Sequence, residues 1–308
     1  MATRVEGPAR VLRPGPVAAV AVGSTLDRDR RQRRESAMNR TDVVVGVDGS
    51  APSRRALRWA AAEAARRGSR LRVLHAYRPP WLVGEIAARA DLDSVARARA
   101  QSVVDDALDE ARAAAPGTPV SGTAVCCHPV PLLMENAGAL TVVGSRGHGG
   151  FGSVLLGSTG LQLATHASGP VAVVRGRTDR DTAPVVVGTD GSAGADLAVG
   201  TAFEAAAARG CFLTAVHAFT GAADARSRAD ADAELHGWLE PWRDKYPEVS
   251  VETVATPGDA ASVLTALSST AHLVVVGTRG RGGFTGLLLG SVGQKLVHYA
   301  HCPVLVAR

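Results

Sequence analysis

Short hydrophobic runs alternate with longer alanine-rich stretches along most of this chain. The runs are rich in valine and continuous, which is typical of parallel strands that are covered on both faces. The alanine-rich stretches place apolar residues three and four positions apart, which predicts helices. Strands are expected near 43–47, 71–76, 119–126, 139–144 and 170–175. The pattern predicts a doubly wound α/β domain with five strands.

Two helices of this domain have clear boundaries or faces in the sequence. Ser50 or Ser53 can cap the first helix with a side-chain oxygen, and Gly68 is suited to end it. The second helix is expected at about 92–115. Its predicted apolar face consists of Leu92, Val95, Val103, Ala107 and Leu108.

The whole pattern then occurs a second time. Residues 43–50 return at 185–192 with an offset of 142 residues, and 142–147 return at 275–280 with an offset of 133. Such self-similarity indicates a duplicated structural unit. We therefore expect a disordered basic tail at 1–40 and two domains at 41–176 and 183–308, joined by a hinge at 176–183.

The two copies differ in the middle. The first has a longer segment after its second strand, which contains Pro79, Pro80 and Trp81. Its third helix is expected to be shorter, because 15 residues separate Pro129 from Gly144. In the second copy, 20 residues separate the matching proline and glycine.

A glycine-rich loop follows the fourth strand of each copy, with the spacing Gly-x2-Gly-x9-Gly-Ser. Glycine lets the backbone approach phosphate oxygens, and successive N–H groups in such a turn bind anions. The final Gly-Ser opens a helix whose N-terminus favours an anion. One such loop could be an ordinary turn, but two with identical spacing favour phosphate binding. The loop residues are Gly144, Gly147, Gly157 and Ser158 in the first copy, and Gly277, Gly280, Gly290 and Ser291 in the second.

An aspartate follows the first strand of each copy, Asp48 and Asp190. If the strand order is 3-2-1-4-5, strands 1 and 4 flank the point where ligands bind in open α/β sheets. Each aspartate would then face a glycine loop and bind ribose or help to order a phosphate-bound Mg²⁺. The alternative is that each aspartate only caps a helix. Arg146 and Arg279 occupy matching loop positions and could support phosphates.

Charge and cysteine usage narrow the class of protein. The formal charge of +5 lies entirely in residues 1–40, and the neutral remainder argues against a nucleic-acid groove. No apolar run approaches the length of a membrane span. The four cysteines lack a CxxC pair, which fits a cytoplasmic protein.

These motifs together resemble the universal stress protein family in its tandem form. The resemblance covers about 41–176 and 183–308, and it implies a Rossmann-like fold, of the adenine nucleotide alpha hydrolase type, that binds ATP. It also implies that Ala76 and Ala218, each after a histidine, present backbone to adenine. Family members pair two domains through their last strands. Here this predicts an intramolecular pseudo-dimer, with a homodimer as a further arrangement.

Other polar residues have simpler explanations. His75 and His217 are expected to bond backbone rather than act as bases. His148, inside the first glycine loop, is as readily a solvated loop residue as a phosphate contact. Cys126 and Cys127 are expected to behave as small hydrophobic residues. No spacing predicts a metal site or a catalytic residue.

The sequence therefore predicts an ATP-binding stress-response sensor or regulator. An ATPase, or an enzyme that transfers phosphoryl or nucleotidyl groups on the same fold, is the alternative. A dimer scaffold with empty sites is a third option. Neither lysine, Lys245 or Lys295, lies in a glycine loop, and no general base is positioned, so hydrolysis is expected to be weak at most.

Overall fold

The computed structural model describes residues 41–78, 86–147, 157–179, 182–221, 224–281 and 289–308. The predicted tail at 1–40 lies outside the described residues. So do the segment with Pro79, Pro80 and Trp81, and His148 in the first glycine loop. Within the described ranges, no helix combines the length and the apolarity that a membrane span requires.

The first copy alternates strands and helices from its first residue to its last. Ser50 caps the first helix, since its Oγ accepts the N–H of Ser53 at 3.3 Å, and Gly68 follows the helix with a φ of +57°. The elements are β1 (Val43–Gly46), α2 (Ala51–Arg66), β2 (Leu71–Tyr77), α3 (Ile86–Ala114), β3 (Val120–Cys126), α4 (Pro129–Glu135), β4 (Leu140–Gly144), α5 (Ser158–His166) and β5 (Val171–Val174).

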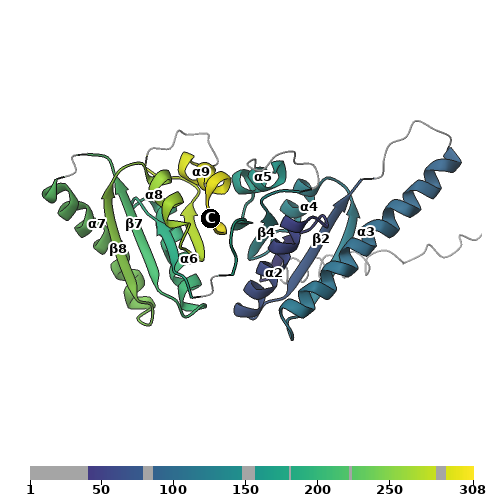
Figure 1. The fold of residues 1–308 in the computed structure, drawn as a ribbon, viewed down its shortest axis with the longest axis horizontal. Helices are drawn as coiled ribbons and strands as arrows, with labels where there is room; N and C mark the ends of the chain where they lie inside the picture. The colour runs from purple at the N-terminus through teal and green to yellow at the C-terminus, as the bar shows by residue number, and fades with distance from the viewer. Residues whose placement is uncertain (1–40, 79–85, 148–156, 180–181, 222–223, 282–288) are drawn as a thin grey trace, which may run out of the picture. The chain divides into compact units, whose positions relative to one another are not determined.

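The second copy repeats this succession, and Ser192 caps its first helix in the same way. Figure 1 shows the two sets of elements along the chain. The elements are β6 (Val185–Gly188), α6 (Ala193–Ala207), β7 (Leu213–Phe219), α7 (Ala225–Lys245), β8 (Val251–Pro257), α8 (Ala260–Leu267), β9 (Leu273–Gly277), α9 (Ser291–Tyr299) and β10 (Val304–Ala307).

Each copy contributes five parallel strands in the predicted order 3-2-1-4-5. All ten strands belong to one sheet, in the order β3-β2-β1-β4-β5-β10-β9-β6-β7-β8. β1 therefore lies between β2 and β4, and β6 lies between β7 and β9. This order places the carboxyl ends of the first and fourth strands of each copy side by side.

The two copies join through their last strands. β5 and β10 pair antiparallel, with Leu305 opposite Ala172, and every residue of both strands is buried. The predicted pairing of the halves inside one chain is therefore confirmed. An uncovered apolar edge would be prone to aggregation, and this pairing removes one such edge from each copy.

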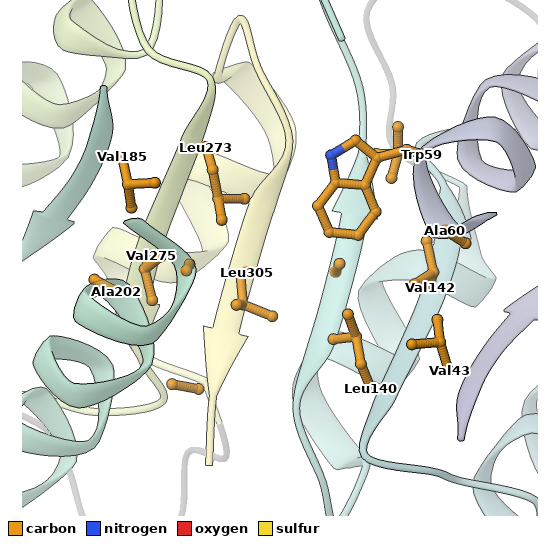
Figure 2. Close-up of a cluster of buried hydrophobic side chains, with 14 of the residues drawn as sticks. Val43, Trp59, Ala60, Leu140, Val142, Val185, Ala202, Leu273, Val275 and Leu305 are labelled. Atoms are coloured by element: carbon orange, nitrogen blue, oxygen red, sulfur yellow. The ribbon is translucent and has the colours of Figure 1, made fainter. Parts of the chain in front are cut away.

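Two hydrophobic clusters cover the two faces of the sheet. One packs side chains from α2, α3, α6 and α7 against strands of both copies, and Figure 2 shows part of it, including Trp59, Leu140, Leu273 and Leu305. The other packs α4, α5, α8 and α9 against the opposite face. Because both clusters contain residues of both copies, the core is continuous across the β5–β10 pair.

The second helix differs from its prediction at its N-terminal end. It begins at Ile86, and the side chain of Val95, expected on the buried face, is 63% exposed. Val103, Ala107 and Leu108 do pack against the core. The predicted apolar face therefore extends too far toward the N-terminus of the helix, where the side chain of Val95 is exposed to solvent instead of packing on the sheet.

The third helix is not markedly shorter in the first copy. α4 has 7 residues and α8 has 8, so the two helices are nearly equal in length. The prediction was wrong because the two prolines that it matched are not equivalent. Pro129 is the first residue of α4, whereas Pro257 is the last residue of β8, and α8 begins only at Ala260.

Candidate functional site

A cleft of about 440 Å³ lies in the second copy at the carboxyl ends of β6 and β9. The connection from β6 leads to β7 on one side, and the connection from β9 leads to β10 on the other. Ligands of open α/β sheets bind at such switch points. The cleft brings together all seven residues that the sequence predicts for this copy, namely Asp190, Ala218, Gly277, Arg279, Gly280, Gly290 and Ser291.

Asp190 ties the glycine loop to the start of α6. Its Oδ1 accepts the backbone N–H of Ser192 at 3.1 Å, and its Oδ2 accepts the backbone N–H of Arg281 at 2.6 Å. A Cβ at Gly280 would lie 2.2 Å from Oδ2, closer than atoms can approach. Glycine at this position therefore allows the carboxylate to reach the loop.

The charge of Asp190 is maintained by these contacts. Burial raises its pKa, but the hydrogen bonds from the Ser192 side chain and from the backbone of Arg281 and Ser192 outweigh that effect. The pKa of Asp190 is consequently below its ordinary value, with a smaller contribution from the positive charge of Arg281. The carboxylate is an anionic hydrogen-bond acceptor at neutral pH, and a weak base.

The other two loop glycines serve packing within the protein. A Cβ at Gly277 would lie 2.4 Å from the backbone oxygen of Gly194, so β9 ends in close contact with α6. The N–H of Gly290 donates to the oxygen of Thr278 at 2.7 Å and closes the loop. The Gly290 N–H is thus already used, although the sequence suggested that loop N–H groups would face phosphate.

The start of α9 supplies other donors to the cleft. Gly290 is the N-cap and no side chain caps the helix. The first N–H groups of a helix lack partners within the helix. In α9 these N–H groups belong to Ser291, Val292 and Gly293, and all three residues line the cleft. The helix dipole favours an anion at this end. This part of the cleft is suited to phosphate.

The remaining wall of the cleft is apolar. It is formed by Val216 and Ala218 at the end of β7, Ala260 and Leu264 of α8, and Val276 of β9. An apolar surface next to an anion-binding helix N-terminus fits a ligand with a flat base at one end and phosphates at the other. Sequence reasoning missed Leu264, because nothing in the repeat marks a helix residue as part of the cleft.

The first copy repeats the backbone arrangement around its aspartate. The Oδ1 of Asp48 accepts the N–H of Ser50 at 3.0 Å, and a Cβ at Gly147 would lie 2.4 Å from its Oδ2. Gly144 contacts the backbone of Pro52, and Gly157 donates its N–H to the oxygen of Ser145 at 2.8 Å. Ser158 begins α5, Arg146 lies in the loop and Ala76 lies near the end of β2. The loop between Gly147 and Gly157 is outside the described residues.

The histidines have the structural role that the sequence predicts. The Nδ1 of His75 lies 2.8 Å from the backbone oxygen of Val47, and the Nδ1 of His217 lies 3.1 Å from that of Thr189. Both side chains are buried. None of the four cysteines forms a disulfide, and the described part of the chain contains no group of three or more His, Cys, Asp or Glu side chains that could hold a metal ion.

Sequence reasoning missed the support behind the second glycine loop. The guanidinium of Arg281 lies 5.3 Å from the centre of the Trp238 ring, within the range of a cation–π contact. Trp238 also meets His217 edge to face, with ring centres 4.8 Å apart. The sequence feature that could have revealed this support is Trp238 itself, because the second helix of the first copy contains no tryptophan.

The family model and the sequence relatives both assign this chain to one family. Residues 39–175 and 182–308 each match the model of the universal stress protein family. A universal stress protein of Mycobacterium tuberculosis is 37% identical over 286 residues, covering 86% of this chain and 96% of the relative.

Solved structures agree with the fold. The crystal structure of a universal stress protein from Archaeoglobus fulgidus has a TM-score of 0.69 and 20% identity, covering 87% of this chain and 98% of that one. A shorter universal stress protein, solved in complex with cAMP, is 30% identical with a TM-score of 0.35, covering 44% of this chain and 97% of its own.

Proposed function

The chain belongs to the universal stress protein family, and from this membership and the second cleft we propose that it is an ATP-binding regulator of a stress response. The cleft is the observation that carries the proposal. Its volume of about 440 Å³ is in the range of small-molecule sites. Its apolar wall and the start of α9 match the two ends of an adenine nucleotide.

Each part of the nucleotide has a counterpart in the second cleft. Adenine lies on the apolar wall with Ala218 presenting backbone, and the phosphates lie at Gly280, Ser291 and Arg279. Each charge-assisted hydrogen bond would contribute about 1.5–3 kcal/mol. Asp190 binds a ribose hydroxyl or a water of the Mg²⁺ that accompanies the phosphates. The matching site in the first copy uses Asp48, Ala76, Gly144, Arg146, Gly147, Gly157 and Ser158.

Regulation by nucleotide binding is favoured over catalysis. Asp190 is the one carboxylate that lines the second cleft among the described residues, and its lowered pKa makes it a poor general base. Lys295, on α9, pairs with Asp259 at 3.3 Å. We therefore expect ATP turnover below about 1 s⁻¹, the low end for ordinary enzymes. Faster turnover would favour the alternative of an ATPase or transferase.

Calorimetric titration with Mg-ATP tests the binding proposal. We expect a stoichiometry near two per chain, with the second site tighter because the first copy departs more from the family pattern. Absence of binding up to millimolar ATP, equivalent to about −4 kcal/mol, would contradict the proposal. Titrations with ADP and cAMP distinguish a triphosphate site from a general nucleotide site.

Matched variants assign the two sites. In Gly280→Ala the new Cβ would collide with Asp190, and in Gly147→Ala it would collide with Asp48. In each variant the stoichiometry should fall from about two nucleotides per chain to about one, and Gly280→Ala should remove the tighter site. Gly237→Ala, at an exposed position in α7 with nothing within 4 Å of an added Cβ, is the control and should retain both.

We also propose a cytoplasmic location. No disulfide joins any of the four cysteines, as expected for a protein that folds in a reducing compartment. Fractionation of the native host, with detection of the untagged chain, tests this assignment.

A further inference from the structure

A second cavity, of about 230 Å³, lies in the first copy between α2 and α3. Its floor is formed by buried or half-buried residues of small or apolar character, including Val47, Leu57 and Ala107. Its rim carries charges of both signs, from Arg54 and Arg99 and from Asp106 and Glu110. For scale, an engineered apolar cavity of about 150 Å³ binds benzene.

The corresponding position in the second copy is filled by an indole ring. The starts of β3 and β8, Val120 and Val251, are 131 residues apart, and the same offset relates α3 to α7. It places Ala107 where the second copy has Trp238. Both residues belong to the same face of their helices, because each packs against the core beneath α2 or α6.

The glycine under the ring confirms this equivalence. A Cβ at Gly191 would lie 2.4 Å from the Trp238 ring, so the indole rests directly on that backbone. The counterpart of Gly191 at the offset of 142 residues is Gly49, which lines the cavity together with Ala107. The φ angle is +83° at Gly49 and +71° at Gly191, so the backbone has a similar conformation at the two positions.

The next turn of these helices also differs between the two copies. In the second copy the Trp242 ring lies on Gly200, where an added Cβ would be 2.3 Å away. The counterpart of Gly200 is Arg58, which forms an ion pair with Glu110. The counterpart of Trp242 is Ala111, so the first copy has an indole at neither position, and Ala107 leaves the position of Trp238 without a side chain of similar size.

We propose that this cavity binds a planar bicyclic aromatic compound of the indole class. The ring would lie on Gly49 beside Ala107, as the Trp238 ring lies on Gly191. The Asp48 carboxylate, which also lines the cavity, can accept the ring N–H. A neutral or zwitterionic substituent suits the rim, because that rim carries both signs of charge. The proposal does not depend on nucleotide binding.

Titration of the nucleotide-free full chain with indole, by calorimetry, tests the proposal. We expect one indole per chain with a Kd below about 1 mM. Ala107→Trp fills the cavity from within and should weaken binding at least tenfold. Trp238→Ala opens the equivalent space in the second copy and should raise the stoichiometry to two.

Three results would overturn the proposal. They are no indole binding by the wild type, unchanged affinity in Ala107→Trp, and a stoichiometry that stays at one in folded Trp238→Ala. Circular dichroism and thermal melting check the fold of each variant. If Ala107→Trp does not fold, Val103→Trp places an indole on the half-buried wall instead, and unchanged affinity there overturns the proposal equally.

Discussion

Asp190 combines a structural and a ligand-facing role in one side chain. Its two oxygens accept backbone N–H groups from the α6 cap and from the glycine loop, yet it also lines the cleft. A carboxylate oxygen has two lone pairs, so each oxygen retains acceptor capacity for a ligand. The half-buried position of Asp190 lets it hold the loop in place before any ligand arrives.

Asp190→Asn should weaken ATP binding at the second site by about tenfold, or about 1.4 kcal/mol. The amide keeps the shape of the side chain but removes the charge, and only one of its two polar ends accepts hydrogen bonds. Asp48→Asn is the matched control and should affect the first site only. Calorimetric titration of both variants gives the two affinities, and equal losses at both sites in either variant would contradict this assignment.

The same residue gives a pH dependence of stability. The pKa of Asp190 is lower in the folded chain than its ordinary value of 3.8. Its stabilising contribution is therefore complete well above pH 3.8 and is lost as the pH falls through the lowered pKa. Urea unfolding should show a larger difference between wild type and Asp190→Asn at pH 7 than at pH 3. A difference that grows toward pH 3 would contradict the sign.

At the level of secondary structure, the N-terminal caps of α2 and α6 have nearly the same geometry. Ser50 and Ser192 each accept an N–H at 3.3 Å from the residue three positions on. Removal of such a cap costs about 1 kcal/mol. Ser50→Ala and Ser192→Ala should each lower the free energy of unfolding by about this amount in urea. Ser102→Ala, at an exposed position inside α3, is the control and should change it little.

The strands and glycine loops were predictable because their signals are local. Continuous valine runs, a serine at a cap and a fixed glycine spacing each act within a few residues. The second helix was harder, because Val95 has the right spacing but lies beyond the part of α3 that packs on the sheet. Trp238 and Leu264 reach their sites through tertiary packing, which no local pattern encodes.

At the scale of the whole molecule, one buried ion pair links the two copies. Glu63 of α2 accepts a hydrogen bond from Arg209 at 2.6 Å, and both side chains are about 97% buried or more. Arg67 and Arg66 also contact this carboxylate. Burial raises the pKa of Glu63, but the charges of Arg209, Arg67 and Arg66 outweigh it and lower the pKa overall.

Glu63→Gln should destabilise the chain by about 3–5 kcal/mol, because it leaves buried arginine charge without its partner. The effect should be largest above pH 4.5, the ordinary value for glutamate, and should decline as the pH falls through the lowered pKa. Asp109→Asn breaks an exposed pair with Arg112 and should cost less than about 1 kcal/mol. Urea unfolding measures both, and equal costs would show that burial of the pair is unimportant.

The β5–β10 pair makes the halves dependent on each other. Val306 is fully buried opposite Val171, so Val306→Asp places a charge without a partner in the junction. We expect the variant to lower the melting temperature of the whole chain or to separate the halves. Hydrogen exchange followed domain by domain distinguishes these outcomes from a local effect. Loss of protection in the second copy alone would contradict the coupling.

Native mass spectrometry of the purified chain with Mg-ATP is the sharpest test of nucleotide binding. It counts bound nucleotides on intact molecules and needs no assumption about heats or affinities. We expect species with one and with two nucleotides per chain, and we expect the species with two nucleotides to be lost in Gly280→Ala. A spectrum that shows only the ligand-free chain at millimolar Mg-ATP would contradict it.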